Sequence, residues 1–442
     1  MNGVCLPAQS EGGKAPHHAS VYDDILKTAR ETWQNALGNC NGCGLCASRC
    51  ELFGDGIASM SDIVGSGMVL LDAIEELFAE SGFDDRTISD TIHTHTEKYD
   101  KLYSLTRRCC LCNNCTARCP GAVRADRVMR PWRALYQRSG LFGTVNNDLK
   151  SVEVDKEWHL FSVYRHLNGV FYPEFIHLDD AGPGQVDTLF FPGCTMVTYM
   201  DDSVRATGKL LDDRGYRWAI DLGCCGSPLV GRGLPERVET LQRKLLDRCH
   251  AAGIKRIITV CAGCEMELVE AVGKHGVGAP EVISLPQLLV DLGVDLPESP
   301  QDVAFFDSCH DRSQSHGSPL RRMFAGCSIC KLEHEGQDTL CCGAGGAVSS
   351  FDAEIGGIRA GRILEEAVAA GAKILISSCP TCAYTFAFQK IYGNPPSESA
   401  GIECRHYLEL LFGIETDWSQ VFARAEWMWT GEHSAWVLSE LT

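Results

Sequence analysis

The sequence contains no apolar run that approaches the ~18 residues of a membrane-spanning helix. Its first 20 residues are polar and lack the apolar core of a secretory signal. Basic side chains are also scarce, with 40 against 58 acidic ones, so the net charge is −18. Because phosphate binding requires a basic face, this balance argues against nucleic acid as a partner. We therefore expect a soluble, cytoplasmic protein that could still dock on the inner face of a membrane through a partner subunit.

Cysteine, in contrast, is abundant, with 24 residues in a chain of 442. A chain of this length has room for two to four domains, and its 45% apolar content is sufficient for a full core. Such a chain has no need of many disulfides. We therefore interpret the cysteines as reduced, metal-bound residues.

Two cysteine runs share the spacing C-x2-C-x2-C-x3-C, which is typical of [4Fe–4S] clusters. In such a run three thiolates can curl around one cube, whereas the fourth lies too far along and reaches a second cube. The predicted sets are Cys40, Cys43, Cys46 and Cys119 for one cluster, and Cys109, Cys112, Cys115 and Cys50 for the other. Zinc normally takes two separated pairs with no cysteine left over, so it is the weaker alternative. Cys110 is set aside as a bystander.

The second half of the chain contains one pattern twice. A short apolar strand leads to a cysteine, and then follow Cys-Cys-Gly, a helix with a glycine stop, a second apolar strand and Cys-x-x-Cys. Cys309 lies 115 residues after Cys194, and the double cysteine and the final pair repeat at offsets of 117 and 118. A near-constant offset indicates two copies of one module. The order strand, helix, strand predicts α/β layers with parallel strands.

Each copy supplies five cysteines, which we expect where strands end and loops begin, the usual ligand crevice of such sheets. The sets are Cys194, Cys224, Cys225, Cys261 and Cys264, and Cys309, Cys341, Cys342, Cys379 and Cys382. Glycine after each double cysteine would supply an unusual backbone angle and a close approach. Five thiolates exceed what a cube needs and predict a cluster of another shape. The plainer alternative is a pair of buried cysteines beside a turn.

This pattern behind a two-cluster ferredoxin module resembles the heterodisulfide reductase family, with the D-type subunit as the best match, over about residues 36–412. The resemblance implies an α+β multidomain chain: a helical ferredoxin domain with two cubane [4Fe–4S] clusters, followed by two α/β CCG repeats that each hold a non-cubane [4Fe–4S] cluster. It also implies that a disulfide is reduced or formed between the two non-cubane clusters, with one electron from each.

A related group leaves a second function open. Iron–sulfur subunits of anaerobic glycerol-3-phosphate, glycolate and lactate oxidation carry similar repeats, and there an FAD-linked partner does the chemistry while the repeats pass electrons to quinone. Those relatives often lack cysteines of the first repeat. This chain lacks none, which favours disulfide chemistry.

The expected partners are those of a redox-complex subunit: a flavoprotein, a hydrogenase-linked protein or a membrane cytochrome b. The expected substrate is a disulfide of a thiol cofactor or of a sulfur-carrier protein. His310, directly after Cys309, could give a proton to the leaving thiolate. An anionic substrate could be held by basic residues, unless these form a solvated helix face: Arg312, Arg321 and Arg322. The extra Cys-x-x-Cys at Cys327 and Cys330 favours a structural role over metal.

The expected domain division follows these motifs. It comprises a tail and helix (1–35), the ferredoxin domain (36–140), a connector (141–184), the first repeat (185–300), the second repeat (301–414) and a C-terminal tail (415–442). The tail holds half of the eight tryptophans. We expect it to pack back on the core, with an aromatic anchor for a partner subunit as the alternative.

Overall fold

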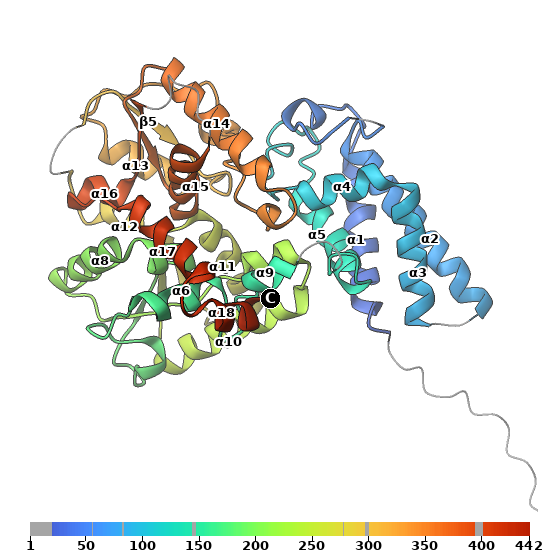
Figure 1. Cartoon of the computed structure of the whole chain (residues 1–442), viewed down its shortest axis with the longest axis horizontal. Coiled ribbons are helices and arrows are strands. Elements are labelled where there is room, and N and C mark those ends of the chain that lie inside the picture. Colours follow the sequence, from blue (N-terminus) through green and yellow to red (C-terminus); the bar gives the residue numbers. More distant parts are fainter. Residues whose placement is uncertain are drawn as a thin grey trace, which may run out of the picture.

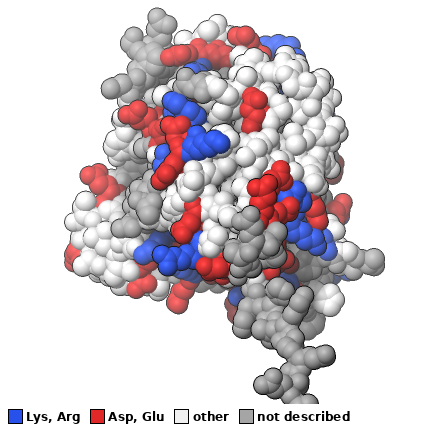
Figure 2. Space-filling model, turned by 90° about the vertical axis from the view of Figure 1, so that its right-hand side faces the viewer, with Lys and Arg blue, Asp and Glu red and all other residues white. Residues whose placement is uncertain are grey.

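The computed structural model describes residues 20–54, 56–81, 84–143, 147–276, 278–296, 300–393 and 401–442. The expected flexible tail at residues 1–19 lies outside these ranges. Within them, no helix combines the length and the apolar character that crossing a bilayer requires. On the face turned to the viewer in Figure 2, Lys and Arg form separate small groups next to Asp and Glu.

The N-terminal part is helical and lies on the right in Figure 1. Its helices are α1 (Asp23–Asn39), α2 (Met60–Ser81), α3 (Asp85–Lys98), α4 (Asp100–Arg108) and α5 (Ala125–Arg138). Trp33 and Trp132 are fully buried between α1, α2 and α5, with ring centroids 4.7 Å apart. The sequence predicts one continuous helix over residues 91–108. This is wrong, because Tyr99 leaves the helical region with φ −120° and ψ 48° and separates α3 from α4.

A connector leads from this helical part to the first sheet. It contains two 3₁₀ turns (Asn147–Val152 and Leu178–Asp180) and helix α6 (Leu160–Asn168). Tyr164 of α6 is buried, and its hydroxyl donates a hydrogen bond to the backbone oxygen of Val421. The connector therefore joins the core of the C-terminal half.

The first repeat folds around a four-stranded parallel sheet in the order β2-β1-β3-β4. The strands are β1 (Thr188–Phe191), β2 (Trp218–Ile220), β3 (Arg256–Thr259) and β4 (Glu281–Ser284). Its helices are α7 (Cys194–Tyr199), α8 (Asp201–Asp213), α9 (Ser227–Arg232), α10 (Pro235–Ala252), α11 (Ala262–His275) and α12 (Leu285–Asp291). The buried side chains of β1 and β3 explain this layer, since a sheet covered on both faces needs apolar residues on both.

The second repeat has a three-stranded parallel sheet in the order β5-β6-β7. Its strands are β5 (Val303–Phe306), β6 (Ile374–Ser377) and β7 (Glu403–His406), and its helices are α13 (Gly317–Met323), α14 (Ala353–Ala369), α15 (Pro380–Tyr392) and α16 (Tyr407–Phe412). The prediction of parallel α/β layers in both copies is confirmed.

One strand of the repeat is absent from the second copy in the described residues. The position beside β5 that corresponds to β2 is taken by a single bridge at Ile329, flanked by Cys327 and Cys330. The backbone N–H of Cys330 donates to Val303 and that of Val303 donates to Ser328. The expectation that both double cysteines follow a strand is therefore wrong for Cys341, which follows a 3₁₀ turn (Gly336–Asp338) and an irregular segment. The extra cysteine pair belongs to this edge segment.

The C-terminal helices α17 (Trp418–Thr430) and α18 (Ser434–Leu441) pack back onto the core, which confirms the expectation for the tryptophan-rich end. In Figure 1 these red helices cross between the two repeats. Trp418 is buried and lies 5.9 Å from Tyr384 of α15, and Trp436 lies 5.2 Å from Trp158. The aromatic side chains thus join the repeats to the connector.

Candidate metal-cluster sites

The two ferredoxin-type cysteine runs curl in the same way. Gly42 and Gly44 have φ of +68° and +72°, and the residues at the same places in the second run, Leu111 and Asn113, both have φ +56°. Left-handed backbone is unusual for a residue such as leucine and is held only where the surroundings determine it. These bends turn successive cysteines of each run toward a common side.

One cavity combines Cys50 of the first run with three cysteines of the second. It has about 410 Å³ of empty space, and its other lining residues include Met60, Leu105 and Met129. Its four cysteines are Cys50, Cys109, Cys112 and Cys115. Reciprocal hydrogen bonds hold the runs together here, because Arg49 Nη2 donates to Asn114 Oδ1 at 3.1 Å and Asn114 Nδ2 donates to Arg49 O at 2.8 Å.

The other crossing joins the end of the second run to the start of the first. A β-carbon on Gly121 would lie 1.9 Å from the carbonyl oxygen of Asn39, so only glycine fits where these backbones touch. Cys119 and Cys40 are the neighbours of this contact in sequence, and the Cys119 sulfur accepts a hydrogen bond from Val123 at 3.4 Å. Cys46 is buried, whereas Cys43 is exposed. Desolvation by burial raises the pKa of the Cys46 thiol.

In the first repeat the five predicted cysteines converge at the carboxyl end of the sheet. The Cys194 and Cys224 sulfurs lie 3.6 Å apart, and hydrogen bonds from Cys224 and Cys264 hold the pKa of Cys225 well below its usual range. Gly226 has φ +95°, as Gly343 has +91° in the second repeat, which confirms the expected role of glycine after the double cysteine. A β-carbon on Gly193 would lie 2.9 Å from the Cys264 sulfur, so the chain passes directly over this site.

In the second repeat the sulfurs form two groups. The Cys342 and Cys382 sulfurs lie 3.1 Å apart. Cys309 and Cys341 pack together in a buried cluster that also contains Cys110, the cysteine set aside in the sequence. Hydrogen bonds from Cys110, Cys112 and Cys309 hold the pKa of Cys341 well below its usual range.

Cys110 was missed although a signal for it exists. "CCLC" is a third double cysteine, and the chain uses the other two to build sites. Cys110 is 1% exposed, and its sulfur donates a hydrogen bond to the carbonyl oxygen of Gly343 at 3.6 Å. The ferredoxin run therefore touches the second repeat directly.

The two five-cysteine sets meet at one point. The sulfurs of Cys261 and Cys379 lie 3.7 Å apart, and mutual hydrogen bonding raises the pKa values of their neighbours Cys264 and Cys382. Among the described residues every cysteine is a free thiol. From the first ferredoxin run to the first repeat, the thiols thus form a nearly continuous series.

His310 lies between the two sets. Its Nδ1 would be 3.0 Å from a β-carbon on Gly263, which sits between Cys261 and Cys264, and its positive form helps to lower the pKa of Cys225. His310 and Cys309 line a large cleft together with residues of α5 and α11. The side chain thus follows a cysteine of the second set while it faces the first.

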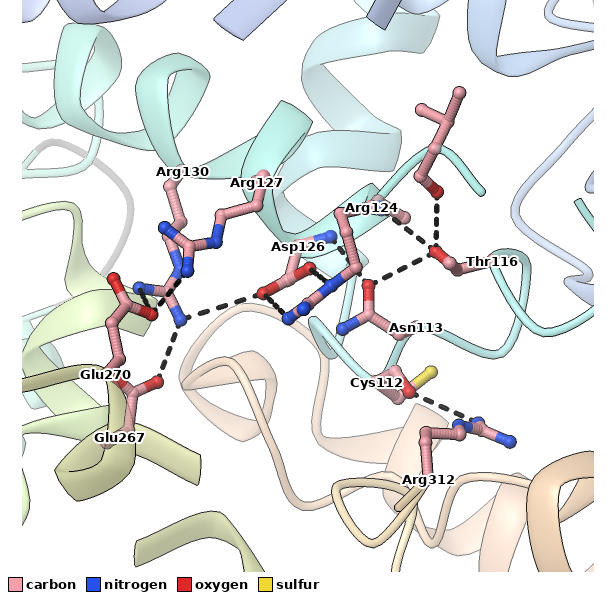
Figure 3. A network of polar contacts seen from close by, with 12 residues as sticks. Cys112, Asn113, Thr116, Arg124, Asp126, Arg127, Arg130, Glu267, Glu270 and Arg312 are labelled. Carbon is pink, nitrogen blue, oxygen red and sulfur yellow. Dashed lines mark hydrogen bonds and ion pairs between the residues drawn. The ribbon is translucent and has the colours of Figure 1, made fainter. Parts of the chain in front are cut away.

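Polar contacts around this cleft join the ferredoxin part to both repeats (Figure 3). Arg130 of α5 contacts Glu267 of α11 at 2.8 Å, and Arg127 contacts Glu270 at 2.6 Å. Burial raises the pKa of Glu267 to about 7 although Arg130 opposes the shift. Arg312 donates to the carbonyl oxygen of Cys112 at 3.2 Å and lines the cleft.

The other two arginines that the sequence singles out lie elsewhere. Arg321 is committed to Asp307, with two hydrogen bonds of 2.7 Å, and Arg322 donates to Gln287. Neither lines the cleft around His310. Of the three, only Arg312 is placed to meet a ligand there.

The charges around the cysteines fit anionic metal–thiolate clusters. Arg133 is fully buried, and within the described residues it contacts no carboxylate; it donates instead to backbone oxygens, including that of Cys109 at 2.5 Å and that of Gly231 at 2.5 Å. A buried cation needs a compensating anion. No three His, Cys, Asp or Glu side chains of the described chain surround a single ion-sized point. The sulfurs line larger spaces, as the ligands of a four-iron body do.

The comparisons with known proteins agree with this arrangement. A family model described as a cysteine-rich domain, CCG, matches residues 188–269 and 303–387. The chain carries two CCG cysteine-rich domains. They contain the two sheets and all ten repeat cysteines.

The relatives are distant. The B-type subunit of fumarate reductase (CoM/CoB) from Methanothermobacter marburgensis is 31% identical over 46% of this chain and 44% of its own length. The D-type subunit of dihydromethanophenazine:CoB–CoM heterodisulfide reductase from Methanosarcina mazei is 25% identical over 62% of this chain and 70% of its own. A probable glycolate oxidase iron–sulfur subunit of Bacillus subtilis is 26% identical over 56% and 60%. The chain spans about half the length of the first curated relatives it matches, 40–58%.

Proposed function

We propose that this chain is an iron–sulfur oxidoreductase subunit that reduces, or in reverse forms, a disulfide of a thiol cofactor or of a sulfur-carrier protein. The observation that carries the proposal is the contact of the two CCG sets, where Cys261 and Cys379 lie 3.7 Å apart beside His310. Two electron-supplying sites at one point suit a bond whose cleavage needs two electrons.

The cysteines of the two crossed ferredoxin sets would hold two cubane [4Fe–4S] clusters, and the two CCG sets would hold two non-cubane ones. When bound, these clusters supply electrons one at a time. The cavity shared by Cys50, Cys109, Cys112 and Cys115 supports the crossed assignment. The contact of Gly121 with Asn39 supports its counterpart.

The protein's own residues have defined tasks in the reaction, which consumes one disulfide, two electrons and two protons and releases two thiols. His310 stands at the edge of the cleft and can hold the proton that a leaving thiolate takes up. Arg312 presents a positive charge in the same cleft. The ion pairs of α5 with α11 keep the ferredoxin part against the wall of the cleft.

A second function is supported by the likeness to the probable glycolate oxidase iron–sulfur subunit. In that case the chain would relay electrons from an FAD-linked dehydrogenase to quinone and would act on no disulfide. For either function we propose that it works as one subunit of a redox complex, with a flavoprotein, a hydrogenase-linked protein or a membrane cytochrome b as partner, in the cytoplasm or on the inner face of the membrane.

The deciding experiment is dye-linked disulfide reduction by the purified, anaerobically prepared chain. We expect oxidation of a reduced low-potential dye that depends on added disulfide. His310→Gln should lower the rate by roughly 100-fold or more, the usual contribution of a proton donor, with iron content unchanged. His93→Gln is the matched control, since this part-buried histidine contacts Ser139 in the helical part. Dye-reducible clusters without turnover on thiol-cofactor or carrier disulfides would instead establish the electron relay.

A further inference from the structure

A buried arginine of the second repeat reaches into the ferredoxin part. Arg359 of α14 is 6% exposed and lines the cavity of Cys50, Cys109, Cys112 and Cys115. Its Nη1 donates to the Cys110 sulfur at 2.7 Å, and its Nη2 lies 3.8 Å from the Cys50 sulfur. Its Nε donates to Glu51 at 2.7 Å. The guanidinium therefore touches the sulfurs of two neighbouring cysteine groups at once.

On its other side the same guanidinium faces the second CCG set. Cys110 packs with Cys309 and Cys341 in one buried cluster. The backbones meet here too, because a β-carbon on Gly345 would lie 2.7 Å from the carbonyl oxygen of Cys110. Of the described contacts between the ferredoxin runs and the repeats, these involve cluster cysteines on both sides.

The first repeat has no such arginine. With the offset of 118 that relates the two helices before the Cys-x-x-Cys pairs, the position of Arg359 corresponds to Leu241. Leu241 packs near Gly226, where its side chain would lie 3.7 Å from a β-carbon on that glycine. The positive charge is thus a property of the second repeat alone at this position.

We propose that Arg359 raises the reduction potential of the sites on either side of it and so makes the second CCG repeat the point where electrons enter the repeats. The inference rests on the proposed clusters and not on disulfide chemistry. A fixed positive charge favours the more negative, reduced form of a neighbouring site, and burial strengthens this effect because water screens it less. Each site gains one electron, and no bond is formed or broken.

The test is an EPR-monitored potentiometric titration of the wild type, Arg359→Gln and Arg362→Gln. Arg362 is the matched control, since it lies on the same helix and contacts the same Glu51 at 3.6 Å but is 53% exposed. Arg359→Gln should shift the reduction equilibrium of a cluster at least tenfold toward the oxidised form, which is 59 mV for one electron. Arg362→Gln should shift it less than threefold.

Equal shifts in the two variants, at equal iron content, would overturn the inference. If Arg359→Gln does not retain iron, Glu51→Gln decides, because loss of the neighbouring negative charge should move the potential upward; an unchanged or lower potential would refute the proposal. A chain with the expected shifts but no turnover on disulfides would keep this inference and contradict the reductase.

Discussion

Gly346 is the position where the contact between the ferredoxin part and the second repeat can be tested by one methyl group. It has φ +66°, and a β-carbon there would lie 2.6 Å from the carbonyl oxygen of Cys109, whereas ordinary contacts begin at 3.4 Å. Gly346→Ala therefore forces the two loops apart. Gly371→Ala is the matched control, because Gly371 has φ +79° but nothing within 4 Å of its β-carbon position.

The expected magnitudes follow from these two geometries. A left-handed backbone costs an L-residue roughly 1–2 kcal/mol, and this cost is common to both variants. Overpacking against rigid backbone adds roughly 1–3 kcal/mol, and only Gly346→Ala carries it. We expect Gly371→Ala to lower the free energy of unfolding by about 1–2 kcal/mol and Gly346→Ala by about 2–5 kcal/mol.

The assay is anaerobic urea unfolding of the complete chain, followed by tryptophan fluorescence, together with the rate at which the ferredoxin clusters pass electrons to the CCG clusters. Gly346→Ala should slow this internal transfer, while Gly371→Ala should leave it unchanged. Equal losses of stability and equal transfer rates in the two variants would refute the direct contact between Cys109 and the Gly345–Gly346 loop.

Two further variants test other parts of the chain. Gly193→Ala should lower the iron content of the first CCG site, because its β-carbon would lie 2.9 Å from the Cys264 sulfur; iron analysis equal to that of the wild type would contradict this. Burial lowers the pKa of His95 to about 4 from 6.5, so the unfolded chain binds this proton more tightly and the stabilising contribution is lost as pH falls from 6.5 toward 4. His95→Gln removes this dependence, and its free energy of unfolding relative to the wild type should rise by about 1.4 kcal/mol per pH unit below 6.5; a difference that stays constant from pH 7.5 to 5.5 would contradict the assignment.

Local spacing was sufficient to predict much of this molecule. The two copies, their parallel sheets and the glycines after each double cysteine follow from patterns within a few residues, and the structure has them. Gly226 and Gly343 adopt the expected positive φ because the chain must turn directly after two adjacent ligands.

What the sequence could not supply depends on contacts between distant segments. Cys110 follows Cys109 directly, yet its side chain faces the second repeat, a direction set by packing against Cys309 and Cys341. Arg359 reaches Cys110 across 249 positions. The break at Tyr99 and the loss of a strand before Cys341 likewise reflect tertiary packing that overrides local helix and strand preferences.

The most direct test of the account is the iron and acid-labile sulfide content of the anaerobically purified chain. Four four-iron sites predict about sixteen iron atoms and as many sulfides per chain. A content near eight of each would mean that only the ferredoxin sites are filled, and it would contradict the claim that the ten CCG cysteines hold two further clusters.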